Sequence, residues 1–260
     1  MILQKIHNVK YLQFENLSKC KNTQHFSTTR IGGISKGKLD SLNTGYTVND
    51  NPKNVSQNLD YLAKVFDLAR DQMVSPKQTH SKNIGIVNSV KDIFPNTDAL
   101  ITNKPGICIF IRTADCVPIL LFDPIKNAVA AIHSGWKSTI QKISKHAIEL
   151  MQKKFGTNPE DLIAGIGPSI GPDAYEVGIE VAKQFQDQFG MNHIITPIKN
   201  SDKYLLNLWE VNKQILVESG IPKKQIEIAE MCTYSNPELF YSARRDGVKT
   251  GRLATGIMLN

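Results

Sequence analysis

The chain has 260 residues, a formal net charge of +7 and 41% hydrophobic residues, an ordinary composition for a globular protein. No apolar run approaches the roughly 18 residues of a membrane-spanning helix, and the N-terminus lacks the apolar core of a signal peptide. We therefore expect a cytoplasmic protein with no membrane partner. Its lysines are scattered, which indicates a lysine-rich surface rather than a nucleic-acid partner.

The cysteines are widely spaced and none forms a CxxC pair: Cys20, Cys108, Cys116 and Cys232. In a cytosolic chain of this size such cysteines are typically reduced. We find no repeat, low-complexity tract or linker, so a single catalytic domain over residues 1–260 is expected.

In chain order, residues 23–50 are rich in Gly, Ser, Thr and Asn, which predicts a long irregular segment with a functional role. A helix is expected from Asn51-Pro52, because apolar residues then recur at helical spacing and Pro suits the first turn. Short apolar runs predict three buried strands, at 106–111, 117–122 and 128–132.

The turn between the last two runs, residues 123–127, is so short that these strands must be antiparallel. If the loop is Asp123 to Lys126, Phe122 faces Asn127, and Cys116 falls opposite His133 on one face of the sheet. A loop one residue longer would put the two side chains on opposite faces. We expect the first register.

A helix is expected after residues 134–137, with an apolar stripe that ends before Phe155-Gly156. The run 161–166 predicts another strand, which leads into the loop GPSIGP. That loop lacks the ending of a phosphate-binding P-loop. Two further helices, near 177–190 and 207–219, and a C-terminal strand complete the expected elements.

Three residues stand out for their chemistry: His80, Cys116 and His133 each lie at the edge of an apolar run. Imidazole and thiolate bind zinc or copper, and an open coordination position can lower the pKa of a bound water. The same side chains can make a cysteine nucleophile, with Cys116 as thiolate and His133 as its base. The residues alone leave both possibilities open.

Ordered motifs along almost the whole chain then match one family: FSTTRIGGISKG with SLNTG, QTH, TDALIT, TADCVPILLFD, AIHSGW, GIGPSIGPDAYEVG and SARRDGVKTGR. With these motifs the chain resembles the multicopper polyphenol oxidase (laccase)-like proteins. They are also described as purine nucleoside phosphorylases, and the family includes the peptidoglycan editing factor. One departure is Lys137-Ser138, where the family usually has Arg-Gly.

The resemblance implies an α+β fold, a four-layer α/β/β/α sandwich with two central mixed or antiparallel sheets, similar to that of glutamine-deamidating toxins. It implies that the metal ligands and catalytic residues are His80, Cys116 and His133. The metal would be Zn²⁺, with Cu²⁺ as the other candidate.

The resemblance further implies phosphorolysis of adenosine, inosine and S-methyl-5′-thioadenosine to free base and (methylthio)ribose 1-phosphate, together with adenosine deamination. Phosphorolysis needs cations that position phosphate, and Arg30 and Arg245 are our candidates because a guanidinium group binds phosphate in bidentate fashion. The expected partners are thus a purine nucleoside and phosphate. We expect a monomer, with an oligomer left open.

Other functions remain as alternatives. One is a hydrolase that removes L-serine from the cell-wall precursor UDP-MurNAc-L-Ser, and another is a hydrolase that uses the Cys/His thiol directly. A third, of a different class, is a metal-binding partner protein without catalysis.

Overall fold

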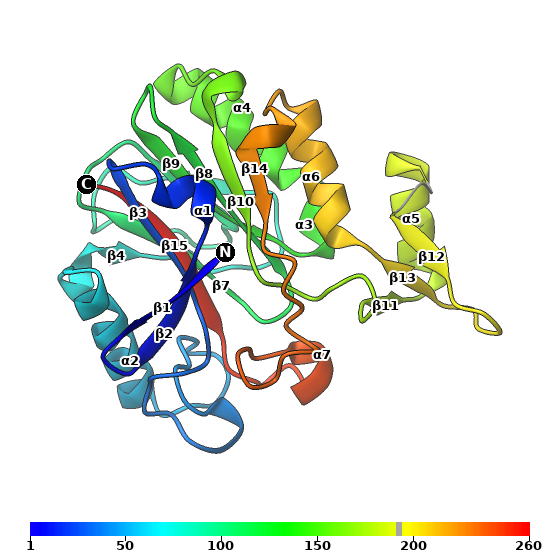
Figure 1. Cartoon of the computed structure of the whole chain (residues 1–260), viewed down its shortest axis with the longest axis horizontal. Coiled ribbons are helices and arrows are strands. Elements are labelled where there is room, and N and C mark those ends of the chain that lie inside the picture. Colours follow the sequence, from blue (N-terminus) through cyan, green and yellow to red (C-terminus); the bar gives the residue numbers. More distant parts are fainter. Residues whose placement is uncertain (191–193) are drawn as a thin grey trace.

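The structure is a computed structural model, and it describes residues 1–190 and 194–260 (Figure 1). Its described part contains two six-stranded sheets and one three-stranded sheet. Across the first large sheet the strands run in the order β1 (Ile2–Ile6), β2 (Val9–Gln13), β3 (Thr23–Thr28), β15 (Leu253–Leu259), β7 (Cys108–Thr113) and β4 (Met73–Val74). Across the second they run β14 (Ile226–Ile228), β10 (Ile163–Ile166), β8 (Val117–Asp123), β9 (Ala128–Ser134), β6 (Ala99–Thr102) and β5 (Ile84–Ile86).

The two large sheets pack face to face, because alternate residues of their strands are apolar on both sides. In β8, Leu120 and Phe122 belong to the core between the sheets, where they meet residues of β7 and β15. Ile119 and Leu121 point the other way and pack against helices.

Helices cover both outer faces. The helix α2 (Pro52–Val65) packs on the first sheet, whereas α4 (Ile143–Phe155) and α6 (Leu208–Glu218) pack on the second. The layers are therefore helix, sheet, sheet and helix. This confirms the α+β sandwich with two central sheets that the resemblance implies.

Several expected elements are confirmed. The three apolar runs form β7, β8 and β9, and the predicted helix start is correct, since Asn51 caps α2 by accepting a hydrogen bond from the Lys53 backbone N–H. The helix expected after residue 137 is two helices, α3 (Trp136–Ile140) and α4, because Lys142 adopts a left-handed conformation between them. Gly156 ends α4 in the left-handed conformation typical of a helix C-terminus.

The turn of the β8–β9 hairpin lies one residue further along the chain than predicted, so the predicted strand partners are wrong by two residues, whereas the prediction that positions 116 and 133 share one face is correct. Asp123 pairs with Ala128, and Pro118 lies opposite His133. The physical reason is the side chain of Asp123, whose Oδ1 accepts hydrogen bonds from the backbone N–H groups of Ile125 and Lys126 at 2.9 Å each. Asp123 thereby extends the strand and moves the turn toward the C-terminus.

The expectation of an irregular segment over 23–50 is wrong for its first residues, which form β3, an inner strand of the first sheet. Its buried side chains are largely polar and bond across the sheet: Thr23 donates to the Met258 carbonyl, and the Ser27 and Thr255 hydroxyls lie 2.9 Å apart. Because these polar side chains have hydrogen-bond partners, they can be buried, and the strand lacks the apolar pattern by which a strand is recognised in a sequence.

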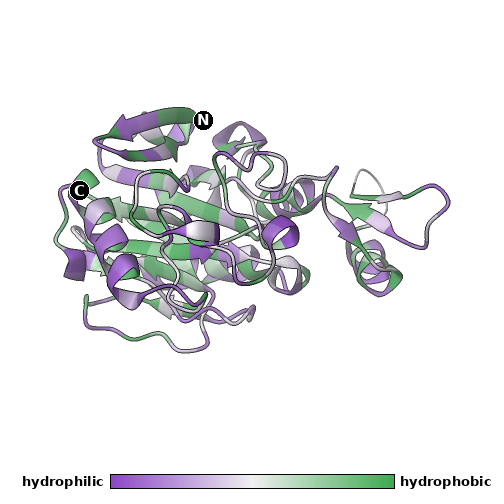
Figure 2. Ribbon diagram, turned by 90° about the horizontal axis from the view of Figure 1, so that it is seen from below, coloured by the Kyte–Doolittle hydropathy of each residue, from purple (hydrophilic) through white to green (hydrophobic). Residues whose placement is uncertain are grey.

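A smaller lobe projects to one side of the sandwich (Figures 1 and 2). It consists of α5 (Ile179–Phe189) and the strands β11 (Glu176–Val177), β13 (Tyr204–Leu206) and β12 (Ile195–Pro197). In Figure 2 hydrophobic residues gather on the central strands. The buried apolar residues of the lobe, among them Ala182, Phe185 and Leu206, belong to the same core cluster as the outer face of the second sheet. In the described residues, no helix combines the length and apolarity that crossing a bilayer requires.

Candidate metal centre

The three predicted donor residues meet at one point. His133 belongs to β9, Cys116 directly precedes β8, and His80 lies in the loop that leads to β5. One ligand atom from each lies within 4.8 Å of the other two, and Cys116 Sγ is 3.8 Å from His80 Nε2. The donors of a tetrahedral zinc site with this composition lie about 3.4–3.6 Å apart, so small shifts would let the three hold one ion.

A single buried carboxylate orients both histidines. Asp98, the residue before β6, accepts a hydrogen bond from His133 Nδ1 at 2.7 Å. Its two oxygens also accept the backbone N–H groups of Thr79, His80 and Ser81, together with the Ser81 hydroxyl. The carboxylate therefore leaves Nε2 of His133 as the free ring nitrogen and fixes the backbone of the loop that carries His80.

The charge state of Asp98 matches this role. Burial alone would raise the pKa of its carboxyl group, but the hydrogen bond and charge of His133 and the bonds from Ser81 hold the pKa well below its usual range. Asp98 is therefore ionised near neutral pH and accepts hydrogen bonds there.

The loop before His80 is attached to the first sheet by Gln78. Its side-chain Nε2 donates to the Arg112 carbonyl and its Oε1 accepts from the Arg112 backbone N–H, both at 2.7 Å. This paired side-chain contact joins the loop to β7, three residues beyond the last β4–β7 pair, Val74 and Ile109. The position of His80 is thereby tied to both large sheets.

Gly135 provides the space in which the thiol and the imidazole meet. A Cβ atom built on it would lie 2.9 Å from His80 Cδ2 and 3.1 Å from Cys116 Sγ. Its backbone φ of −70° is open to any residue, so the requirement for glycine is steric.

The carboxylate that precedes the cysteine has a structural task. Asp115 accepts hydrogen bonds from the hydroxyls of Thr233 and Ser242 and from the backbone N–H of Arg244. It thus holds the first turn of α7 (Ala243–Asp246) beside the turn that presents Cys116. Because Asp115 is the chain neighbour of Cys116, these hydrogen bonds also fix the backbone that positions the thiol.

The thiol and the imidazole perturb each other's titration. Burial would raise the pKa of Cys116, but the charge of His133 and hydrogen bonds from both histidines lower it to about 6. Burial would lower the pKa of His133, but the Cys116 charge and the Asp98 hydrogen bond raise it to about 9. Without a metal, the two form a thiolate–imidazolium pair near neutral pH. The thiolate is also the form that binds a metal.

A cavity of about 850 Å³ opens from these donors. The charged groups in its lining are mostly cationic: Arg70, Lys77, Arg112 and Arg252, with Asp92 as the one carboxylate among the described residues. Three exposed apolar side chains, Tyr46, Ile93 and Val248, lie at its rim. The volume falls within the range of small-molecule sites.

Arg30 and Arg245, the predicted phosphate ligands, line a separate hollow of about 340 Å³. Arg245 forms a two-pronged ion pair with Asp246 and donates to the backbone carbonyls of Thr233, Tyr234 and Phe240. Arg30 donates to the carbonyls of Asp40 and Pro237. The structure does not bring these two guanidinium groups to the cavity, because the chain itself uses their donors.

Asp98, Gln78 and Arg112 are functional residues that the sequence patterns above do not predict. Asp98 and Gln78 stood inside the motifs TDALIT and QTH, where an acid directly before a buried strand was the available signal. The signal for Arg112 was an arginine within an otherwise apolar strand, since arginine is rarely buried without a partner.

The comparisons with known proteins agree with the motifs. The profile of a family described as multi-copper polyphenol oxidoreductase laccase matches residues 24–260. A protein of Bacteroides thetaiotaomicron named purine nucleoside phosphorylase is 38% identical over 96% of this chain and 97% of its own length. Adenosine deaminase RL5, from an unknown prokaryotic organism, is 33% identical over 95% of this chain and 98% of its own length.

Solved structures show the same architecture. The hypothetical protein YfiH of Bacillus licheniformis aligns over 99% of both chains, with a TM-score of 0.91 and 32% sequence identity. YlmD of Geobacillus stearothermophilus aligns over 99% of this chain and 98% of its own, with a TM-score of 0.90 and 30% identity.

Proposed function

Since the chain belongs to the multi-copper polyphenol oxidoreductase laccase family, whose relatives include named purine nucleoside phosphorylases and an adenosine deaminase, we propose that it is a metal-dependent enzyme of purine nucleosides. It carries out phosphorolysis of adenosine, inosine and S-methyl-5′-thioadenosine and deaminates adenosine. The observation that carries this proposal is the convergence of His80, Cys116 and His133 at the end of one large cavity.

The ion is held by the two imidazoles and the thiolate, a donor set that suits Zn²⁺ and also Cu²⁺. Such an ion, when bound, acts as a Lewis acid that activates water or polarises the purine. The chain's own groups prepare the site: Asp98 orients His133 and the His80 loop, and Gly135 leaves the space between the donors.

The cavity provides the remaining requirements of a nucleoside reaction. Its volume accommodates a nucleoside, its exposed rim of Tyr46, Ile93 and Val248 offers apolar contact to a base or a methylthio group, and its cations attract phosphate. Phosphorolysis depends on holding phosphate against the anomeric carbon of the sugar, which a positively charged wall favours.

The test is a product analysis on metal-loaded protein. Incubation with adenosine should give adenine and ribose 1-phosphate when phosphate is present, and inosine with or without phosphate. Release of serine from UDP-MurNAc-L-Ser with nucleosides untouched would replace this proposal by the cell-wall hydrolase. Metal binding without turnover of any of these substrates would leave a binding protein.

One observation favours a second candidate, a thiol hydrolase. Cys116, His133 and Asp98 form a chain of contacts in which the pKa of the thiol is lowered to about 6 and the imidazole is fixed by a carboxylate. Cys116→Asp separates the two, because a carboxylate can bind a metal but cannot form a thioester. Retained metal with retained nucleoside turnover would exclude the thiol as nucleophile. Retained metal with complete loss of turnover would favour it.

A further inference from the structure

Arg112 is a half-buried cation without a carboxylate partner among the described residues. It lies in β7, lines the cavity, and forms no ion pair with any residue in the described ranges 1–190 and 194–260. Its Nε donates to the Thr44 carbonyl at 2.7 Å and its Nη1 to the Ser75 hydroxyl at 2.8 Å. Both acceptors are neutral. A charge that is partly withdrawn from water and held only by neutral groups is destabilising, and an anionic ligand would offset that effect.

The surroundings increase this cost rather than reduce it. Burial and the charge of Arg70 lower the pKa of Arg112 to about 10. Lys77 lines the same cavity, and the contact of Arg70 with Asp60 is long, at 3.9 Å, and exposed. Arg252 also lines the cavity, but its guanidinium donates to the backbone carbonyls of Val248, Thr250 and Gly251, so it contributes charge and not free donors. With Asp92 as the one carboxylate in the described lining, the cations outnumber the acids, which is typical of an anion-binding wall.

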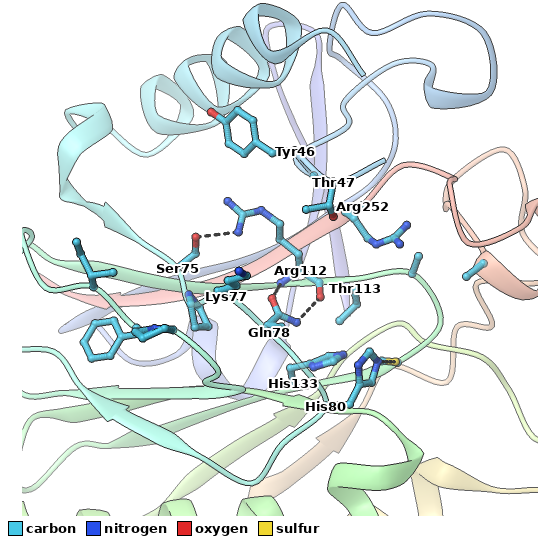
Figure 3. Close-up of a pocket in the computed structure, with 18 of the residues that line it drawn as sticks. Tyr46, Thr47, Ser75, Lys77, Gln78, His80, Arg112, Thr113, His133 and Arg252 are labelled. Atoms are coloured by element: carbon cyan, nitrogen blue, oxygen red, sulfur yellow. Dashed lines mark hydrogen bonds between the residues drawn. The ribbon is translucent and has the colours of Figure 1, made fainter. Parts of the chain in front are cut away.

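The cationic wall is distinct from the metal centre. Arg112 lies on β7 of the first sheet and Arg252 directly precedes β15, whereas His133 lies on β9 of the second sheet and Cys116 directly precedes β8. In Figure 3 the Arg112 guanidinium is turned toward Ser75, while His80 and His133 lie together in another part of the cavity. The cavity thus joins two chemically different regions.

We propose that Arg112, with Ser75 and the nearby charges of Arg70 and Lys77, is the binding site of the phosphate that takes part in phosphorolysis. The role in phosphorolysis rests on the proposed function, whereas the binding of inorganic phosphate does not. The guanidinium holds the anion through its Nη atoms, since Nε is occupied by Thr44. Arg30 and Arg245, in their separate hollow, have no part in it.

The reaction balances with hydrogen phosphate. One phosphate oxygen forms a bond to the anomeric carbon while the bond from that carbon to the base nitrogen breaks. The electron pair of the broken bond goes to the base, which takes up a proton. Hydrogen phosphate loses one proton when it becomes the sugar 1-phosphate ester, so no other reactant is required.

Deamination uses water in place of phosphate, and the two activities should therefore respond differently to Arg112→Gln. Glutamine retains hydrogen-bonding groups but loses the charge. We expect the KM for phosphate to rise by about 10-fold or more, because a charge-assisted hydrogen bond is lost. The ratio of phosphorolysis to deamination should fall by a similar factor, with bound metal retained.

A second variant, Arg70→Gln, keeps the proposal testable if Arg112→Gln does not fold. Arg70 is partly exposed, so Arg70→Gln should fold normally and raise the KM for phosphate by about 3-fold through loss of a neighbouring charge. Lys145→Gln, on α4 outside the cavity, is the matched control for charge removal and should leave the KM unchanged. A ratio that stays constant in both Arg112→Gln and Arg70→Gln would overturn the proposal.

A direct binding measurement separates this proposal from the proposed function. Inorganic phosphate should raise the thermal midpoint of the wild-type protein and not that of Arg112→Gln. This result can be obtained even if no nucleoside is turned over, in which case only the proposed function fails. Stabilisation by adenosine 5′-monophosphate but not by inorganic phosphate, or equal stabilisation of both proteins by phosphate, would contradict the phosphate site.

Discussion

At the scale of single residues, the donor geometry depends on groups that touch no substrate. Asp98 accepts the His133 ring N–H and three backbone N–H groups of the His80 loop. Gly135 keeps the volume between Cys116 and His80 free. Each of these residues can be changed without removing one of the three proposed metal ligands.

Asp98→Asn should lower metal affinity by about 10- to 100-fold, as is typical when the partner of a metal-binding histidine is replaced. Asp98 accepts from His133 Nδ1 and from the backbone N–H groups of the His80 loop. In asparagine one of the two carboxylate oxygens is replaced by an NH₂ group, which cannot accept a hydrogen bond, so either His133 or the His80 loop must move. Competition with a chelator of known affinity measures the effect. Asp92→Asn, in the same cavity but without contact to a ligand, is the control, and equal metal affinities in the two variants would refute this role of Asp98.

Gly135→Ala should disrupt the same centre by steric pressure, because its methyl group would lie 2.9 Å from His80 and 3.1 Å from Cys116. We expect at least about 10-fold weaker metal binding and a loss of about 1–3 kcal/mol of stability from overpacking. Gly178→Ala is a close match, since Gly178 also precedes a helix with a similar backbone and its Cβ would meet only the flexible Glu180 side chain. Metal content and unfolding midpoints of the two variants, measured together, decide the matter.

At the scale of elements, sequence patterns predicted those strands and helices whose apolar residues recur regularly. They found β7, β8, β9 and α2, since these bury continuous apolar runs or an apolar stripe. They missed β3, where buried Thr and Ser side chains bond to the neighbouring strand. The hairpin turn lies one residue further along the chain than predicted, so the strand partners differ by two residues, because a side-chain contact of Asp123 decides where the strand ends.

The same distinction applies to the site. His80, Cys116 and His133 were visible as reactive residues at strand edges, and the structure brings them together. Asp98, Gln78 and Arg112 act through contacts between segments far apart in the chain, which no local pattern contains. Arg30 and Arg245 look equally suited to phosphate in sequence, but backbone carbonyls and Asp246 occupy their guanidinium groups.

The loop that leads to the cavity wall at Gly45 and Tyr46 is held by one helix residue. Asn58 of α2 accepts the Ile34 backbone N–H and donates to Ser35 Oγ and to the carbonyls of Ser41 and Asn43. Asn58→Ala leaves these buried groups unsatisfied and should cost about 3 kcal/mol of unfolding free energy.

The control for this prediction is Gln57→Ala, one residue earlier on the exposed side of α2, which should change stability by less than about 0.5 kcal/mol. Denaturant unfolding measures both variants. Equal midpoints for the two would show that the Asn58 contacts do not stabilise the loop.

At the scale of the whole molecule, the two sheets contribute different chemistry to one cavity. The second sheet supplies the soft donors His133 and Cys116, and the first supplies the cations Arg112 and Arg252. The Gln78 contact to β7 and the Asp98 contact to the His80 loop join the two sheets at this point. The site therefore depends on the correct packing of the entire sandwich.

The stability of the metal-free protein should depend on pH through the central pair. The pKa of Cys116 is lowered to about 6, so its contribution is present at high pH and is lost as the pH falls through about 6. The pKa of His133 is raised to about 9, so its contribution is present at low pH and is lost as the pH rises through about 9. The difference in thermal midpoint between metal-free wild type and Cys116→Ala should peak between these values. A difference that does not vary with pH would contradict the pairing.

The proposed function rests on one ion held by two imidazoles and a thiolate. A crystal structure of the zinc-loaded protein, with anomalous data collected on both sides of the zinc absorption edge, tests it most directly. We predict one strong peak within about 2.0–2.3 Å of His80 Nε2, Cys116 Sγ and His133 Nε2, and its loss in Cys116→Ala. A peak elsewhere on the chain, or one at this position that persists in Cys116→Ala with unchanged occupancy, would contradict the account.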